Sequence, residues 1–188
     1  MQMKGSLLGA IVFMLLVAAQ PWNQNKLNQF TEGFVSNVGA ANSESWQFVS
    51  GSMADGDTFR VQQSGTEMPI RLCGIDAPEK AQPLGLRAQN YLQSLINEGD
   101  GSVAVVPVER DRYGRMVAEV FVLGNEEKFL QTELLQAGLA YVYPQYVDSC
   151  PNSEPMKLAE AIAQEEGLGV WSGEYQRPWE FRQSKRGH

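Results

Sequence analysis

Five apolar runs of strand length, separated by turn signals, place the strongest limit on the fold of this chain. We predict strands over the ranges 46–49, 58–62, 68–75, 103–108 and 116–123. Asp55-Gly56 and Ser64-Gly65 have the composition of hairpin turns between the first three runs. Helices lie between some of these strands, but no run is long enough for the βαβ units of a parallel sheet. We therefore expect an α+β, mainly β fold, namely a five-stranded OB-fold-type barrel with added helices.

Three segments have the apolar spacing or end signals of helices, at 84–96, 129–137 and 155–166. Residues 139–143 are predicted to be extended. The predicted barrel domain covers residues 46–172. Residues 173–188 form a C-terminal tail, whose aromatic residues can dock on the domain and whose basic end we expect to fray.

The first 19 residues have the pattern of an export signal. Lys4 precedes an uncharged run at 7–19 that ends in small residues. Because this run is short for a membrane span, we favour a secreted or periplasmic protein over one anchored in the membrane through residues 7–19. Residues 20–45, rich in Asn, Gln, Ser and Gly, are predicted to be a linker.

The formal net charge of −7 argues against a protein that binds nucleic acid through a broad basic surface, since phosphate affinity comes largely from Lys and Arg. A locally basic, metal-dependent site is still compatible with this charge. The only histidine is His188, so a Ser-His-Asp triad is not expected. Cys73 and Cys150, the only cysteines, either form a disulfide or leave Cys73 as a buried thiol.

Arg71 lies inside an apolar run, where a charged side chain needs a partner or a ligand. If 68–75 is one continuous strand, Arg71, Cys73 and Ile75 face the same way. Asp76 and Glu79 then lie just past its end and can gather with Arg71 at one rim of the barrel. The alternative is that Asp76 caps a turn and Glu79 opens the next segment.

Two further residues extend this cluster. Asp55-Gly56 already accounts for a turn, so Asp57 is a second carboxylate that the turn does not need. Arg115 follows Gly114 at the start of another predicted strand. Two arginines and several carboxylates at one rim are suited to metal-assisted phosphodiester hydrolysis, and hard oxygen ligands favour Ca²⁺ or Mg²⁺.

Four motifs, "DGDTFRV", "RLCGIDAPE", "DRYGR" and "AEAIAQEEGLGVWS", occur in this order between residues 46 and 172. Together they resemble the staphylococcal nuclease (thermonuclease) family. The resemblance implies a five-stranded OB-type barrel with three helices and a calcium-dependent nuclease. Its substrate would be DNA or RNA, cleaved to leave 3′-phosphates.

The resemblance also implies a role for individual residues. Calcium ligands would be Asp57, Asp76 and the backbone carbonyl of Ala77, where the family often has Thr. Glu79 would activate water, and two arginines, Arg71 and Arg115, would bind the phosphate.

Three tyrosines, Tyr113, Tyr141 and Tyr143, match the family's nucleotide pocket. For Tyr141 and Tyr143, a half-buried strand face is an equal alternative. The loop after Glu79 looks shorter than in the staphylococcal enzyme, and the chain is acidic. We therefore expect weak, salt-sensitive and calcium-dependent substrate binding. The alternative function is a catalytically silent barrel that binds nucleic acid or protein. We expect a monomer with no obligate protein partner.

Overall fold

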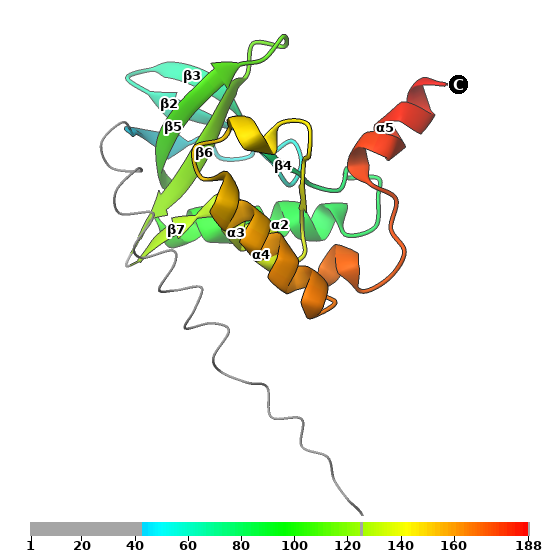
Figure 1. Cartoon of the computed structure of the whole chain (residues 1–188). Helices are drawn as coiled ribbons and strands as arrows, with labels where there is room; N and C mark the ends of the chain where they lie inside the picture. Colours follow the sequence, from blue (N-terminus) through cyan, green and yellow to red (C-terminus); the bar gives the residue numbers. More distant parts are fainter. Residues whose placement is uncertain (1–42, 125, 188) are drawn as a thin grey trace, which may run out of the picture.

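The computed structural model describes residues 43–124 and 126–187 (Figure 1). The predicted leader at 1–19 and nearly all of the predicted linker at 20–45 lie outside the described residues. The strands are β1 (Glu44–Phe48), β2 (Thr58–Gln63), β3 (Thr66–Leu72), β4 (Ile75–Asp76), β5 (Ser102–Arg110), β6 (Met116–Leu123), β7 (Glu127–Phe129) and β8 (Tyr141–Val142). The α-helices are α2 (Gly85–Glu98), α3 (Leu130–Gln136), α4 (Ser153–Glu165) and α5 (Pro178–Arg186).

Six strands form one sheet in the order β3-β2-β1-β5-β6-β7, with antiparallel pairing between neighbours. In addition, β3 pairs with β6 in parallel, with Ile70 opposite Met116. This extra pairing closes a ring of five strands, as the α+β barrel prediction requires. β7 continues the sheet outside the ring, and β4 and β8 form a separate two-stranded pair. The predicted fold class is confirmed.

The interior of the ring is filled by large apolar side chains that alternate along the strands. In β2, Phe59 and Val61 are fully buried, whereas Arg60 between them is exposed. Ile70 on β3 and Val120 on β6 are also fully buried. Because burying one such side chain contributes about 1.5–3 kcal/mol, this alternation fixes which face of each strand points inward.

Three helices cover one end of the ring (Figure 1). Each buries an apolar stripe at the spacing of an amphipathic helix. The buried residues are Ala88, Leu92, Leu95 and Ile96 in α2, Leu130, Leu134 and Leu135 in α3, and Met156, Ala159 and Ala163 in α4. All three helices were expected, although α3 starts one residue later than predicted because Phe129 ends β7. None of the helices in the described part of the chain is both long and apolar enough to cross a membrane.

Only one of the two predicted hairpin turns is confirmed. Ser64 and Gly65 join β2 to β3 with φ of 50° and 79°, the left-handed conformations of a two-residue hairpin. In contrast, Asp55-Gly56 belongs to a long connection between β1 and β2, so its prediction as a hairpin turn was wrong. An added Cβ on Gly56 would lie 2.7 Å from the Cβ of Ala88 and 2.8 Å from that of Ala77. This loop therefore packs tightly against α2.

The prediction of one strand over residues 68–75 was also wrong. β3 ends at Leu72, and Gly74 turns the chain with φ of 72° before β4 begins at Ile75. A residue with a side chain is strained in this conformation, so Gly74 ends the continuous strand. Arg71, Cys73 and Ile75 therefore do not share one strand face. The turn places Asp76 beside Arg71 instead of farther along the same strand.

The tail forms a fourth helix in addition to the three predicted in the domain, and its basic end is helical where fraying was expected. α5 begins with Pro178 at its first position, carries Glu180 in its first turn and ends with Lys185 and Arg186. These residue types suit the two ends of a helix, because negative charge is favoured near the N-terminus and positive charge near the C-terminus. Figure 1 shows α5 beside β4, away from the other helices.

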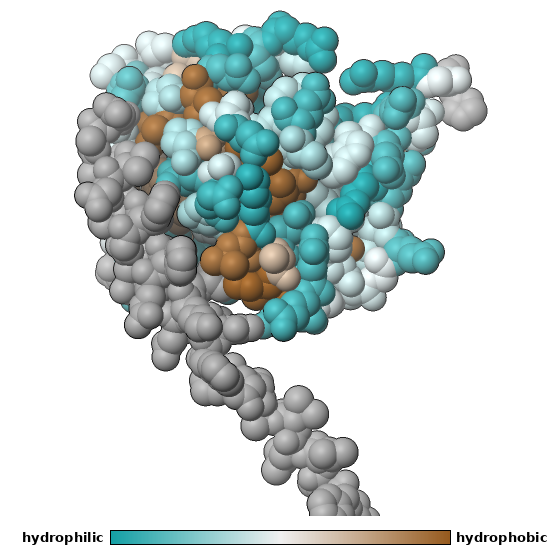
Figure 2. All heavy atoms as spheres, viewed as in Figure 1, coloured by the Kyte–Doolittle hydropathy of each residue, from teal (hydrophilic) through white to brown (hydrophobic). Residues whose placement is uncertain are grey.

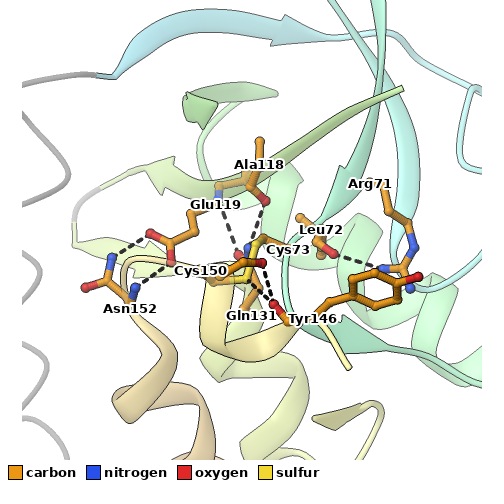
Figure 3. The surroundings of a disulfide bond; sticks show 11 residues. Arg71, Leu72, Cys73, Ala118, Glu119, Gln131, Tyr146, Cys150 and Asn152 are labelled. Carbon is orange, nitrogen blue, oxygen red and sulfur yellow. Dashed lines mark hydrogen bonds between the residues drawn. A yellow bond between two sulfur atoms is a disulfide. The ribbon is translucent and has the colours of Figure 1, made fainter. Parts of the chain in front are cut away.

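Cys73 and Cys150 form a disulfide with a Cα–Cα distance of 6.1 Å and a sequence separation of 77 residues. It ties the turn between β3 and β4 to the segment that leads into α4 (Figure 3). Beside it, the fully buried carboxylate of Glu119 accepts hydrogen bonds from the backbone N–H and the Nδ2 of Asn152, both at 2.6 Å. The disulfide therefore fixes the residues that follow Arg71 to the segment before α4.

Candidate active site

A cavity of about 850 Å³ opens between the β5–β6 hairpin and α5. It is lined by all of the predicted site residues except Tyr141, namely Asp57, Arg71, Asp76, Ala77, Glu79, Tyr113, Arg115 and Tyr143. These residues come from four separate segments of the chain. Closure of the ring brings the segments together, because β3 then lies between β2 and β6.

Arg71 lies at the centre of the cluster and is mostly buried, with a side-chain exposure of 13%. Its Nη1 lies 3.2 Å from Asp57 Oδ2, and its Nη2 donates to Asp76 Oδ1 at 2.9 Å. Nη1 also donates to the carbonyl oxygen of Leu72 at 2.9 Å. The planar guanidinium can hold both carboxylates at once, and its orientation is fixed by these three contacts. These contacts account for a mostly buried charge in β3.

Asp57 precedes β2 and is 4% exposed. Its Oδ1 accepts from the hydroxyl of Thr58 at 3.0 Å, and its Oδ2 accepts from the backbone N–H of Ala77 at 2.7 Å. The hydrogen bond to Ala77 joins the loop before β2 to the segment after β4. Asp57 and Ala77 therefore lie next to each other, as expected for ligands of one cation.

Asp76 on β4 is 1% exposed, and Glu79 follows it in the loop before α2. Both carboxylates accept from Arg182 of α5. Arg182 Nη2 donates to Asp76 Oδ2 at 2.7 Å, while Nη1 donates to Asp76 Oδ1 at 3.1 Å and to Glu79 Oε1 at 2.8 Å. The predicted metal ligand and the predicted base thus share one cationic partner.

Arg115 reaches the same cavity from the turn between β5 and β6. Its Nε donates to Asp111 Oδ2 at 2.7 Å, and its Nη1 lies 3.4 Å from the hydroxyl of Thr58. The turn is closed by Gly114, with φ of 80°, and by backbone bonds from Tyr113 and Arg115 to Asp111 Oδ1. Partial burial acts to raise the pKa of Asp111, but the hydrogen bonds from Arg115 and from the backbone lower it overall.

The carboxylates crowd one another. Burial and the neighbouring charge of Asp57 raise the pKa of Asp55 to about 7. Burial also raises the pKa of Asp76, against the effect of its hydrogen bonds from Arg182 and of the charge of Arg71. A cation at this position would relieve the repulsion between these carboxylates.

The residues fit a calcium site with few protein ligands. Within 43–124 and 126–187, no three Asp, Glu, His or Cys side chains are grouped as a metal cage. The predicted set needs only two carboxylates and one backbone carbonyl, and Ca²⁺ accepts such oxygen ligands together with water. Asp57 and Asp76 are nearly buried, negatively charged and joined through Arg71, so this donor set suits a hard cation.

The three tyrosines differ in their surroundings. Tyr113 is 67% exposed, and the guanidinium carbons of Arg112 and Arg115 lie 5.4 and 5.6 Å from its ring centre. Tyr143 lines the cavity and stacks on Trp179 at 5.2 Å between ring centres. Tyr141 is 1% exposed and packs against the tail, so the structure does not bring it into the cavity.

Among the charged residues that line the site, Asp55 and Arg182 contact predicted site residues and had not been predicted. Asp55 had been assigned to a turn, yet it lines the cavity beside Asp57. Arg182 lies in the tail, more than 100 residues from Asp76. The end signals of α5 predict a helix there, but no local pattern indicates its partner.

The chain matches the family model described as "Staphylococcal nuclease homologue" over residues 69–173. It is 36% identical over 135 residues to an uncharacterized endonuclease of Escherichia coli O157:H7, covering 70% of this chain and 81% of that protein. It is 32% identical over 139 residues to the micrococcal nuclease of Shigella flexneri, covering 70% and 78%.

A staphylococcal-like nuclease of Arabidopsis thaliana is 38% identical over 121 residues, which cover 63% of this chain and 34% of the plant protein. The family match begins within β3 and ends after Trp171. It contains Arg71, Asp76, Glu79 and Arg115, whereas Asp57 and Arg182 lie outside it.

Proposed function

Because the chain belongs to the staphylococcal nuclease family, we propose that it is a calcium-dependent nuclease that hydrolyses phosphodiester bonds of DNA or RNA and leaves 3′-phosphates. The observation that carries this proposal is the position of Arg71 between Asp57 and Asp76, in a cavity that Glu79 and Arg115 also line. Ion pairs that served only to stabilise the fold would not need to line a cavity of about 850 Å³.

In this proposal, the side chains of Asp57 and Asp76 and the carbonyl of Ala77 hold the calcium ion. When bound, calcium neutralises charge on a non-bridging oxygen of the scissile phosphate. Arg71 and Arg115 donate hydrogen bonds to the phosphate oxygens as negative charge develops there. Their planar guanidinium groups can each hold two oxygens, which a lysine cannot do.

Glu79 is the proposed general base. It lies on the loop that follows Asp76, at the edge of the cavity, with its side chain 29% exposed. From this position it can orient a water molecule and accept its proton while the water oxygen attacks phosphorus. The bond from phosphorus to the 5′ oxygen then breaks, the departing 5′ oxygen takes up a proton from solvent, and the phosphate stays on the 3′ side.

Arginines concentrated at the cavity support a nucleic-acid substrate despite the acidic composition. Outside α5, its lining includes Arg71, Arg110, Arg112 and Arg115. Because phosphate contacts by Lys and Arg carry most of the affinity, binding should be local and should weaken steeply with added salt. Tyr113 and Tyr143 are proposed to stack on a base or sugar near the scissile phosphate.

The Cys73–Cys150 disulfide supports the proposal that the protein works outside the cytoplasm, since such bonds persist in oxidising compartments. The predicted leader at 1–19 agrees with this location. Intact mass of the exported protein would show loss of the leader, whereas a retained leader in the membrane fraction would favour the anchored form.

One assay tests the catalytic proposal. The protein is incubated with plasmid and with single-stranded DNA or RNA in Ca²⁺, and in parallel with EGTA. We expect degradation only with calcium, to fragments that a polymerase extends only after phosphatase treatment. If the protein binds the substrate in calcium but leaves it intact, the result would instead support a binding module. If the polymerase extends the fragments without phosphatase treatment, the product does not carry a 3′-phosphate.

A further inference from the structure

Arg182 occupies the carboxylates that the proposed reaction needs. Its three hydrogen bonds engage both oxygens of Asp76 and one oxygen of Glu79, at 2.7–3.1 Å. Asp76 Oδ1 also accepts from Arg71. No oxygen of Asp76 therefore lacks a cationic donor. A metal ion at Asp76 and the guanidinium of Arg182 would compete for the same atoms.

The competition is electrostatic as well as steric. Arg182 carries a full positive charge, because a guanidinium group is not deprotonated in proteins. Two cations bound to one nearly buried carboxylate repel each other strongly at the low effective dielectric of such a site. While Glu79 Oε1 accepts from Arg182, that oxygen is also less available to take a proton from water.

The segment that carries Arg182 is held mainly by polar and aromatic contacts. The guanidinium of Arg177 lies over the rings of Tyr141 and Trp171, at 4.1 and 4.5 Å, and Trp179 stacks on Tyr143. Gln82 Nε2 donates to the carbonyl of Gln176 at 2.8 Å. These contacts dock residues 173–187 across one side of the cavity.

Release of this segment would expose the half-buried rings of Trp179 and Phe181, but few of its side chains are fully buried. Pro178 is the only buried residue of α5. Figure 1 shows the helix apart from the core helices, and Figure 2 shows a mainly hydrophilic surface over it at the upper right. Segments with few buried apolar contacts open at low free-energy cost. α5 can therefore leave its place without disturbing the ring of strands.

We propose that Arg182 fills the cation position of the site before calcium binds, and that calcium displaces Arg182 and lifts residues 173–187 from the cavity. This inference rests on the proposed calcium-dependent function and adds a switch to it. Calcium and the docked tail bind the same carboxylates, so each weakens the binding of the other by the same factor.

Calcium affinity provides the first test, measured by isothermal titration calorimetry on the full chain with calcium alone. Arg182→Gln removes the competing cation, so we expect at least a tenfold lower Kd for calcium. Lys185→Gln is the matched control, since it removes one charge from the same helix but has no ion pair in the described structure; we expect a change of less than threefold. Arg182→Lys keeps the charge without the planar fork and should give an intermediate Kd.

Hydrogen exchange provides the second test and separates displacement from simple loss of charge. In the wild-type protein, calcium should speed amide exchange in residues 178–186 at least tenfold. In Arg182→Gln, exchange there should already be fast without calcium. Exchange in β3 and β6 should stay slow in both proteins, which confirms that the ring remains folded.

The outcomes separate the two proposals. The switch is overturned if wild-type protein binds calcium without faster exchange in α5, or if it binds calcium as tightly as Arg182→Gln does. Either result leaves the nuclease proposal standing. Failure of both proteins to bind calcium, with the ring folded, would overturn the calcium-dependent function and the switch together.

Discussion

Nη2 of Arg71 donates to Oδ1 of Asp76 at 2.9 Å, although the two residues belong to different sheets. The pair forms because the Gly74 turn places β4 beside the end of β3. The planar shape of the Arg71 guanidinium should therefore matter for activity, as well as its charge.

Arg71→Lys should fold normally and lose at least about a hundredfold in kcat, or about 3 kcal/mol of transition-state stabilisation. A lysine keeps the charge but cannot reach Asp57, Asp76 and the phosphate together. Steady-state cleavage of DNA, with urea denaturation as a check on folding, measures this. Arg60→Lys is the matched control, because Arg60 forms only an exposed pair with Glu67 on the neighbouring strands. Rates close to wild type in Arg71→Lys would remove Arg71 from the mechanism.

Tyr113→Ala should weaken substrate binding without affecting stability. Tyr113 is 67% exposed, and stacking of a base on an aromatic ring is worth about 1–3 kcal/mol, so KM for single-stranded DNA should rise roughly fivefold or more. Leu86→Ala removes another exposed side chain, outside the cavity, and should leave KM unchanged. Equal KM values for wild type and Tyr113→Ala would argue that this ring does not contact substrate.

Loss of the disulfide should destabilise the protein strongly. A cross-link between residues 77 positions apart lowers the entropy of the unfolded chain, and the expected cost of Cys73→Ala with Cys150→Ala is about 4 kcal/mol. The free energy of unfolding in urea measures this cost. Activity should fall as well, because the bond anchors the turn between Arg71 and Asp76. A double variant within 1 kcal/mol of wild type would contradict the prediction.

Glu119 should make stability depend on pH. Burial raises its pKa above 4.5 in the folded state, against the hydrogen bonds from Asn152. The folded state therefore binds more protons than the unfolded state above pH 4.5, and this contribution to stability falls as pH rises through that range up to the folded pKa.

Glu119→Gln removes this titration and should flatten the fall in unfolding free energy between two assay pH values, one near 4.5 and one well above it. Glu119→Ala should instead cost about 1–3 kcal/mol at both values, since the buried N–H groups of Asn152 lose their acceptor. Denaturation of the three proteins at the two pH values provides the comparison. An unchanged slope in Glu119→Gln would assign the pH dependence to other groups.

The strands of the ring could be predicted because short stretches of sequence specify them. Alternating apolar residues in 58–62 and the Ser64-Gly65 pair specify a strand and a two-residue turn without reference to the rest of the chain. The break after Leu72 was missed because the run from Met68 to Ile75 has no polar residue apart from Arg71. Gly74 was the available signal, since a glycine inside a strand pattern often marks a bend.

The site likewise contains residues that local motifs identify and one residue that they do not. Asp57, Asp76 and Glu79 were identified from ordered motifs, and the structure places them at one cavity with Arg71 and Arg115. Arg182 could not be found in this manner, because its partners are set by how the tail folds back over the domain. A single arginine in a basic, polar segment has no feature that distinguishes an ion pair with Asp76 from exposure to water.

The parallel pairing of β3 with β6 also affects how the protein behaves at high concentration. It pairs Ile70–Leu72 of β3 with Met116–Ala118 of β6 and so covers the facing edge of each strand over three residues. In the six-stranded sheet described here, the outer edge belongs to β7, which is three residues long and begins with Glu127 and Lys128. Short, charged edges add further strands poorly. The folded domain should therefore resist edge-to-edge aggregation.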